Sequence, residues 1–223
     1  MSRRSYHFCG SILLLFSFLH CLAQPQELVK KNIVFEQLPA ELGLGQRAVN
    51  EIMQDSEGYM WISTWSGLIR YDGRISKIYG VGDHEGDLKS SKITSVCEGK
   101  NGDLWVGSRA GGLFRYVRLS DSFTPYSQLL PELLPFRNIW DLEIDLQGNL
   151  WLATEEGLVS INGDQVTVYD VSRGLSDNFI TSIYKDPQHR FWLTTDHGLN
   201  HFDTQKGVLI RKYYYEFEGE DRR

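Results

Sequence analysis

The sequence predicts an all-β fold of four tandem β-propeller-type blades, each a four-stranded antiparallel repeat. Four tryptophans recur at spacings of 44, 46 and 41 residues, which matches the length of one four-stranded blade. Glycine and turn residues recur about every 8 to 12 residues, too often for helices. The chain also holds 6 Trp, 11 Tyr and 11 Phe, residues that favour strands. The recurring tryptophans, which we expect in the core, are Trp61, Trp105, Trp151 and Trp192.

Residues 1–23 have the pattern of a cleavable secretion signal. Arg3 and Arg4 precede an apolar run at residues 12–22, and a small residue, Ala23, stands at the expected cleavage point. The run is shorter than the ~20 apolar residues that cross a bilayer. We therefore expect cleavage after Ala23 and a periplasmic or secreted protein, with an uncleaved anchor as the alternative.

The composition that remains after this cleavage excludes one class of partner. It contains 21 Lys and Arg against 29 Asp and Glu, a net charge of −8. Because nucleic-acid binding depends on basic contacts to phosphate, we expect no nucleic-acid partner. Cys97 would be the single remaining cysteine, so no internal disulfide is expected.

Residues 24–48 are expected to form an N-terminal strand and a linker. Residues 33–38 are similar to the fourth strand of a repeat, and Gly43-Leu44 is similar to the linker that follows such a strand. In closed propellers a strand of this kind completes the last blade.

Each repeat is expected to hold four short strands. The strand around Trp61 has three consecutive apolar residues, which predicts burial on both faces. Sheets packed face to face around an axis bury such strands, and radial repetition leaves only short edges. In the first blade the predicted strands are residues 49–54, 59–64, 68–71 and 75–79. The predicted blades are residues 49–80, 81–126, 127–170 and 171–215, and residues 216–223 form a C-terminal tail.

Other positions repeat with the tryptophan. An aspartate stands six residues before it in three copies, and Gly99 takes this place in the second copy. We interpret this aspartate as a turn-capping carboxylate rather than a calcium ligand. Apolar residues recur nine and twelve residues before the tryptophan. These pairs are Val49 and Ile52, Ile93 and Val96, Ile139 and Leu142, and Ile180 and Ile183.

The combined pattern resembles the two-component regulator propeller repeat. Its central part, Asp-x-x-Gly-x-Leu-Trp-hydrophobic-x-Thr, is present at residues 145–154, and Gly198-Leu199 carries the Gly-Leu pair of the fourth copy. The resemblance covers about residues 33–215. It implies a periplasmic, carbohydrate-responsive sensor at the N-terminus of a hybrid histidine kinase of the type common in Bacteroidetes. No kinase segment follows the fourth repeat in this sequence, so we expect no enzymatic activity from this chain.

The number of repeats predicts an incomplete propeller. The resemblance implies about seven blades, and a ring of seven needs about 300 residues. An open set of four blades would expose apolar faces at both ends. We therefore expect a fragment of a sensor, truncated before any kinase, that pairs with remaining blades, a second propeller half or another copy in a dimer. A complete four-bladed ring is the alternative.

One rim of the repeats is expected to bind ligand. Strand direction places the turns between second and third strands at the same rim as the linkers between blades, and these segments differ among the copies. Variable loops on a fixed scaffold commonly carry binding residues. Trp and Arg beside amides suit an oligosaccharide, through stacking and forked hydrogen bonds. The candidate residues are Trp65, Arg109, Arg47, Glu155, Asp196, His197, Asn138 and Asn178, and each has the alternative of a solvated loop residue.

The sequence carries no convincing catalytic set. His197 and His201 are four residues apart, but they bracket a turn and no third metal ligand accompanies them. We therefore expect no metal and no cofactor. The leading interpretation is a ligand-sensing module of a two-component system. The alternatives are a carbohydrate-active propeller enzyme, a lyase or hydrolase, and a protein-binding propeller scaffold.

Overall fold

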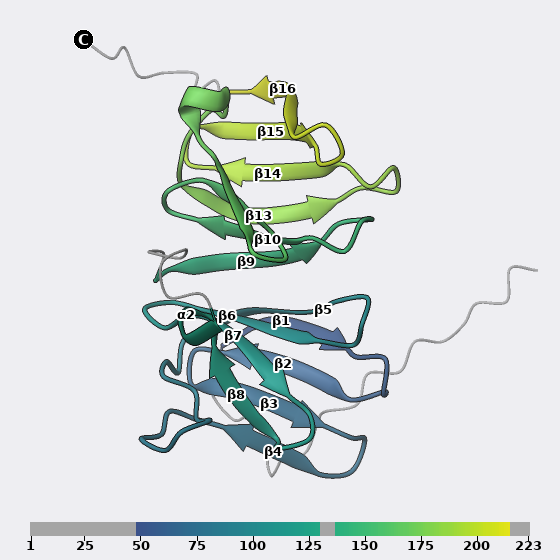
Figure 1. Ribbon diagram of the computed structural model, residues 1–223, viewed down its shortest axis with the longest axis vertical. Coiled ribbons are helices and arrows are strands. Elements are labelled where there is room, and N and C mark those ends of the chain that lie inside the picture. Colours follow the sequence, from purple (N-terminus) through teal and green to yellow (C-terminus); the bar gives the residue numbers. More distant parts are fainter. Residues whose placement is uncertain (1–47, 130–136, 215–223) are drawn as a thin grey trace, which may run out of the picture. The chain divides into compact units, whose positions relative to one another are not determined.

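The computed structural model describes residues 48–129 and 137–214, which form four four-stranded antiparallel sheets (Figure 1). Within each sheet the strands lie in chain order, so each repeat is one sheet of consecutive hairpins. The predicted all-β, blade-type fold class is confirmed. The predicted signal, the N-terminal strand and Arg47 lie outside the described residues.

The four sheets have the following strands. The first holds β1 (Val49–Gln54), β2 (Met60–Thr64), β3 (Gly67–Tyr71) and β4 (Ser76–Tyr79), and the second holds β5 (Ile93–Glu98), β6 (Leu104–Ser108), β7 (Gly112–Val117) and β8 (Ser122–Pro125). The third holds β9 (Ile139–Ile144), β10 (Leu150–Thr154), β11 (Leu158–Asn162) and β12 (Gln165–Tyr169), and the fourth holds β13 (Ile180–Lys185), β14 (Phe191–Thr195), β15 (Gly198–Asp203) and β16 (Val208–Tyr213). Two short helices connect sheets, α2 (Tyr126–Leu129) and the 3₁₀ helix η2 (Val171–Arg173).

The first strands of successive sheets lie side by side. β5 contacts β1 on one side and β9 on the other, and β9 in turn contacts β13. In the first three sheets the third residue of the first strand bonds to the next sheet. Glu51 accepts from the Val96 amide at 2.7 Å, and Asp141 accepts from the Ile183 amide at 2.8 Å. Ser95 makes the same contact to its neighbouring sheet. One side chain at one position therefore links each first strand to the next.

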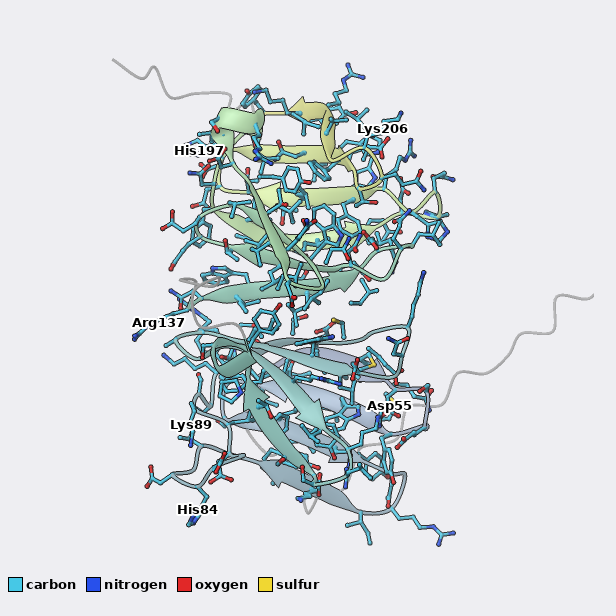
Figure 2. All side chains as sticks on the ribbon, in the orientation of Figure 1. Asp55, His84, Lys89, Arg137, His197 and Lys206 are labelled. Carbon is cyan, nitrogen blue, oxygen red and sulfur yellow. The ribbon has the colours of Figure 1, made fainter. Side chains whose placement is uncertain are left out.

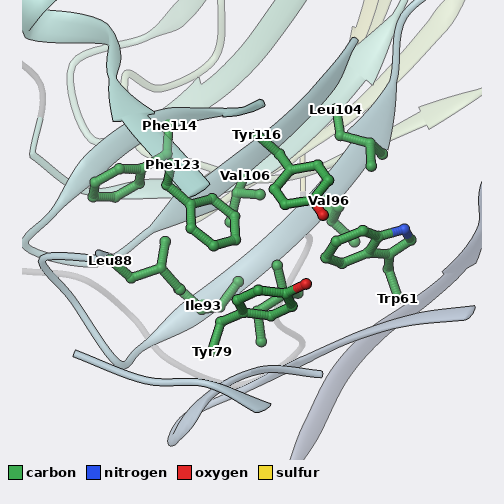
Figure 3. Close-up of a cluster of buried hydrophobic side chains, with 11 residues drawn as sticks. Trp61, Tyr79, Leu88, Ile93, Val96, Leu104, Val106, Phe114, Tyr116 and Phe123 are labelled. Atoms are coloured by element: carbon green, nitrogen blue, oxygen red, sulfur yellow. The ribbon is translucent and has the colours of Figure 1, made fainter. Parts of the chain in front are cut away.

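Three hydrophobic clusters fill the spaces between successive sheets. Between the first and second sheets, Trp61 and Tyr79 of one sheet meet Phe114, Tyr116 and other side chains of the next (Figure 3). The tryptophans of the first three sheets pack in these spaces, and all four tryptophans lie beside a tyrosine at or just after the end of the outer strand. The pairs are Trp61–Tyr79, Trp105–Tyr126, Trp151–Tyr169 and Trp192–Tyr213, with ring centroids 5.8, 5.7, 5.6 and 5.9 Å apart.

The four tryptophans are not equally buried, which differs from the expectation that all lie in the core. Trp61 and Trp151 are 0% and 2% exposed. Trp105 and Trp192 are only partly buried. Trp105 borders a cavity, and the face of the fourth sheet that carries Trp192 has no described sheet packed against it.

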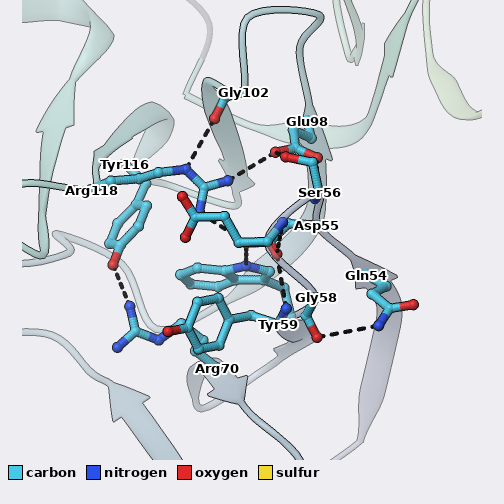
Figure 4. Close-up of polar contacts among 12 residues, drawn as sticks. Gln54, Asp55, Ser56, Gly58, Tyr59, Arg70, Glu98, Gly102, Tyr116 and Arg118 are labelled. Atoms are coloured by element: carbon cyan, nitrogen blue, oxygen red, sulfur yellow. Dashed lines mark hydrogen bonds and ion pairs between the residues drawn. The ribbon is translucent and has the colours of Figure 1, made fainter.

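The hairpin aspartates cap the turns that precede the tryptophan strands. Asp55 accepts hydrogen bonds from the amides of Glu57 and Tyr59 at 3.1 and 2.9 Å and from the Trp61 indole at 2.8 Å (Figure 4). Burial opposes the charge of Asp55, but the hydrogen bonds from Trp61 and Arg118 outweigh it and lower the pKa of this carboxyl. This supports the predicted capping role.

Each first strand contains a β-bulge one residue from its start. Val49 pairs with Thr64 and Glu51 pairs with Ser63, so Asn50 between them has no partner in the ladder. The same shift occurs in the other three sheets. A bulge redirects the side chain of the extra residue. The bulge residues are Asn50, Thr94, Trp140 and Thr181.

Candidate functional site

The two ends of the sheets carry different kinds of residue (Figure 2). One end carries His197, which lies in a turn between a second and a third strand, and Arg137 and Lys89, which lie in linkers between sheets. The opposite end carries Asp55 and Lys206, which lie in the other hairpins. This is the arrangement expected from strand direction. We call the end with His197 the variable rim.

A pocket of about 440 Å³ opens at the variable rim. All four bulge residues line it, together with two residues from the turns that follow β2 and β6. We call it the rim pocket. Its lining residues are Val49, Asn50, Glu51, Trp65, Thr94, Arg109, Trp140, Asp141, Thr181 and Ser182.

In each sheet, the turn between the second and third strands lies at the variable rim, and a hydroxyl residue holds this turn by a hydrogen bond. Thr64 donates to the Gly67 carbonyl at 2.7 Å, and Thr154 donates to the Gly157 carbonyl at 2.7 Å. Gly157 is required because its φ is +137° and a Cβ there would lie 2.4 Å from the Tyr169 carbonyl oxygen. The residue after each hydroxyl residue is the first residue of such a turn. These residues are Trp65, Arg109, Glu155 and Asp196.

Aromatic and guanidinium groups form a stack across the sheets. The Arg109 guanidinium carbon lies 4.2 Å from the ring centroid of Trp140 and 5.6 Å from that of Trp65. Trp140 also packs against Phe179, with centroids 5.1 Å apart. Trp65, Arg109 and Trp140 come from the first, second and third sheets, and Phe179 precedes the fourth. Trp65, Arg109 and Trp140 thus give the pocket a wall to which the first three sheets contribute.

Hydrogen bonds orient one member of this wall, Trp65. Asn50 accepts a hydrogen bond from the Trp65 indole at 2.5 Å and donates to the Ile93 carbonyl at 2.6 Å, so the bulge of the first sheet orients Trp65. The Trp140 indole nitrogen is buried and has no hydrogen-bond partner among the described residues.

Two carboxyl groups, those of Glu51 and Asp141, also line the rim pocket. Burial raises the pKa of Glu51 to about 7, although the hydrogen bonds from Val96 and Ser95 partly oppose this. Burial also raises the pKa of Asp141, against hydrogen bonds from Ile183 and other donors. Glu51 therefore changes charge near neutral pH.

The structure places the predicted site residues in different surroundings. Trp65 and Arg109 line the rim pocket together. Asn138 donates to both oxygens of Glu155 at 3.0 and 2.9 Å, so these two residues bind each other.

The remaining predicted residues lie on the fourth repeat and its linker. His197 contacts the Asp177 carboxylate, and Asn178 accepts from the Val171 amide at 2.9 Å. Asp196 is exposed. None of the three lines the rim pocket.

The sequence-based list omitted the residues that project from the bulges. The signal was present in the spacing of the apolar pairs, because residues three apart fall on opposite faces of a regular strand. Ile93 and Val96 nevertheless pack in the same cluster, and this requires an extra residue between them. An odd apolar spacing repeated four times therefore predicts a bulge.

His197 and His201 have separate partners. His201 stacks on Trp192 with centroids 4.2 Å apart, whereas His197 contacts Asp177. Within residues 48–129 and 137–214, no group of three or more His, Cys, Asp or Glu is arranged to hold a metal ion. In the same part of the chain, no helix has the length and apolar character needed to cross a membrane.

Repeated four-stranded sheets with these inter-sheet contacts define a protein of the β-propeller-repeat class. The sequence model described as two component regulator propeller matches residues 43–66, 87–110 and 174–197. The first, second and fourth repeats therefore match the two component regulator propeller model in sequence, and the third sheet has the same strand order as the others.

Similar proteins include sensors and enzymes. Histidine kinase P4 from Formosa agariphila is 39% identical over 67 residues, covering 30% of this chain and 5% of that protein. The extracellular domain of BT3049 from B. thetaiotaomicron, assigned as a hybrid two component system, has a TM-score of 0.65 and 21% identity over 82% of this chain and 24% of that one. Virginiamycin B lyase from Staphylococcus aureus has a TM-score of 0.59 and 12% identity over 77% of this chain and 57% of that one. The chain thus spans a small part of the sensors that it matches.

Proposed function

We propose that this chain is the ligand-sensing part of an extracytoplasmic two-component receptor and that a carbohydrate binds in its rim pocket. The observation that carries the proposal is the stack of Trp65, Arg109 and Trp140, to which three sheets contribute one side chain each. Aromatic faces pack on the apolar faces of sugar rings. The hydroxyl, amide and carboxyl groups around the stack supply hydrogen bonds for sugar hydroxyls.

A sensing role is supported by the repeats themselves. Three of the four match the two component regulator propeller model, and one matching relative is a histidine kinase. We propose that the chain lies outside the cytoplasm after cleavage following Ala23, and that kinase modules of the receptor read out ligand binding. A site formed jointly by several sheets suits this role, because a bound ligand would change the contacts between sheets.

The test is a titration of the purified chain with a panel of neutral and acidic oligosaccharides, followed by calorimetry. Trp65→Ala and Arg109→Ala should weaken binding at least about tenfold, as expected for aromatic and Arg anchors. Asp196→Ala is the matched control, since it occupies the same turn position in the fourth sheet without lining the pocket. Equal binding by all four proteins would refute this site, and binding of no oligosaccharide by the folded chain would favour a protein-binding scaffold.

A propeller enzyme is the second candidate, and one observation favours it. Glu51 in the rim pocket has a pKa of about 7, the range suited to a general acid or base. If the chain is a lyase or hydrolase, an oligosaccharide that it binds should be cleaved, and Glu51→Gln should abolish the cleavage. Mass spectrometry of the incubated oligosaccharides separates the two functions, because a sensor returns them intact.

A further inference from the structure

The second repeat lacks the carboxylate that the other hairpins place beside the tryptophan strand. Asp145 accepts from the Trp151 indole at 2.8 Å, as Asp55 does from Trp61. Gly99 stands at this position in the second sheet, and the turn is otherwise unchanged. The Gly99 amide donates to the Asp103 carbonyl at 2.8 Å, and the Asp55 amide donates to the Tyr59 carbonyl at 2.9 Å. Only the side chain is missing.

The loss leaves an indole donor without its partner. Trp105 is the tryptophan of this repeat, and its Nε1 has no hydrogen-bond partner among the described residues. The position of a Cβ on Gly99 would lie 3.8 Å from this nitrogen. The indole N–H therefore points toward the space that a carboxylate fills in two other repeats.

A second side chain is also missing from this place. Between the first and second sheets, Arg118 of the β7–β8 hairpin contacts Asp55 at 3.0 Å and Glu98 at 2.8 Å, and so fills the space beside Trp61 (Figure 4). The matching hairpin of the third sheet is the two-residue turn Gly163-Asp164. A short turn cannot reach as far as Arg118 does.

The two omissions together leave a cavity of about 430 Å³ between the second and third sheets. We call it the interblade cavity. Trp105 and Tyr126 line one part, with ring centroids 5.7 Å apart, and the side chain of Ile161 adds apolar surface. Asn101, Gln147 and Asp164 provide the polar part of the lining. The volume lies in the range of small-molecule sites.

The charges of the lining favour an uncharged ligand. The Lys100 ammonium contacts the Leu146 carbonyl, and Asp103 is paired with Arg115 at 2.6 Å. Burial and then the negative charge of Asp164 raise the pKa of Tyr126. An anion would therefore meet a carboxylate, whereas hydroxyl groups bind carboxylates and amides well.

We propose that the interblade cavity binds a small uncharged polyhydroxylated molecule the size of one sugar ring. An oxygen of this molecule accepts the Trp105 indole N–H in the place that an aspartate occupies in other repeats, and its apolar face packs on Tyr126. This site is separate from the rim pocket and goes beyond the proposed sensing of an oligosaccharide there.

The test uses Gly99→Asp, which restores the carboxylate. Gly99 does not have a positive φ, and an added Cβ would meet its nearest neighbour, the Asp103 carbonyl oxygen, at 3.6 Å, so the change fits the backbone. Gly99→Ala is the matched control, because it stiffens the turn without supplying an acceptor. Glucose, galactose, mannose and their uronic acids serve as probes, and the ¹⁵N–¹H resonance of the Trp105 indole reports binding.

The expected result is a saturable shift of the Trp105 resonance with at least one neutral sugar. Affinity should fall at least about tenfold in Gly99→Asp and change less than about threefold in Gly99→Ala. Trp65→Ala should leave this shift intact, which separates the two sites. No shift with any neutral sugar, a tighter response to the uronic acids, or equal effects of the two Gly99 variants would overturn the proposal.

Discussion

At the residue scale, two hairpin aspartates, Asp55 and Asp145, each join a turn to a tryptophan. Asp145 accepts from the amides of Gln147 and Asn149 through one oxygen and from the Trp151 indole through the other. The bonds explain why the aspartate and the tryptophan recur at a fixed distance. Gly99 of the second repeat keeps the turn but has no side chain to bond to the indole, and Asp186 of the fourth repeat bonds to Arg190 instead.

Asp145→Ala should therefore destabilise the chain. It removes the carboxylate that accepts hydrogen bonds from the amides of Gln147 and Asn149 and from the Trp151 indole. The buried Trp151 N–H is then left without a partner, which costs about 2 to 4 kcal/mol in the free energy of unfolding. Asp83→Ala is the control, since Asp83 is exposed. Urea denaturation measures both, and equal stability of the two variants would contradict a capping role.

Glu51 should make stability depend on pH. Burial raises its pKa from 4.5 to about 7, with smaller contributions from the charges of Asp141 and Glu143. The folded chain thus holds this proton more tightly than the unfolded chain, so stability should fall as pH rises from about 4.5 to 7. Glu51→Gln removes this contribution and should be more stable than the unchanged chain at pH 8, on the order of 2 kcal/mol, but not at pH 4.

Denaturation at pH 4, 6 and 8 measures this difference. The Asp141 carboxyl, whose pKa burial also raises, should leave a residual slope of the same sign in Glu51→Gln. Lys185, which pairs with Glu143 at 2.6 Å, is unchanged in both proteins. Parallel pH profiles would show that folding does not change the pKa of Glu51 and would contradict this account.

At the element scale, the bulge decides what the first strand of each sheet presents. In the second, third and fourth sheets it places both apolar residues of the strand in one cluster, and in all four sheets the bulge residue lines the rim pocket. The third residue then bonds to the neighbouring first strand. The bulge thus contributes both to the packing between sheets and to the lining of the rim pocket.

Deleting Thr94 tests this role of the bulge. Without the extra residue, Ile93 would move to the opposite face of the strand, and we expect a loss of more than about 4 kcal/mol or failure to fold. Thr94→Ala keeps the bulge and loses only the hydrogen bond from Thr94 to the Ile139 carbonyl, at a cost of about 1 kcal/mol. Similar stability of the two variants, measured by chemical denaturation, would contradict the assigned register.

The strands were predictable because glycine, aspartate and tryptophan recur at fixed spacings. The rim was predictable because strand direction fixes which turns lie together, and this identified Trp65 and Arg109. The contributions of Asn50 and Thr94 do not follow from strand direction, because both residues lie at bulges that a regular strand lacks. The pairing of Asn138 with Glu155 depends on contacts between a linker and a turn that local sequence does not specify.

At the scale of the whole molecule, each of the three spaces between successive sheets contains the tryptophan of a repeat, but different side chains fill the space around it. The first is closed by Arg118 and by Asp121, which binds Arg70, Tyr79 and Tyr116. Burial opposes ionisation of Asp121, but these donors and Lys77 lower its pKa to about 2. The second space retains the interblade cavity, and the third is closed by aromatic contacts around Trp151. Only the first strands are linked by the same bonds throughout, and the rim pocket lies beside these links.

The central claim is that a ligand binds where the bulges and turns of the sheets converge. A crystal structure of the purified chain with the tightest-binding oligosaccharide tests it most directly. The account predicts electron density for a sugar ring in the rim pocket, within contact distance of Trp65, Arg109 and Trp140. Density at the opposite end of the sheets, with the rim pocket holding only water, would contradict it.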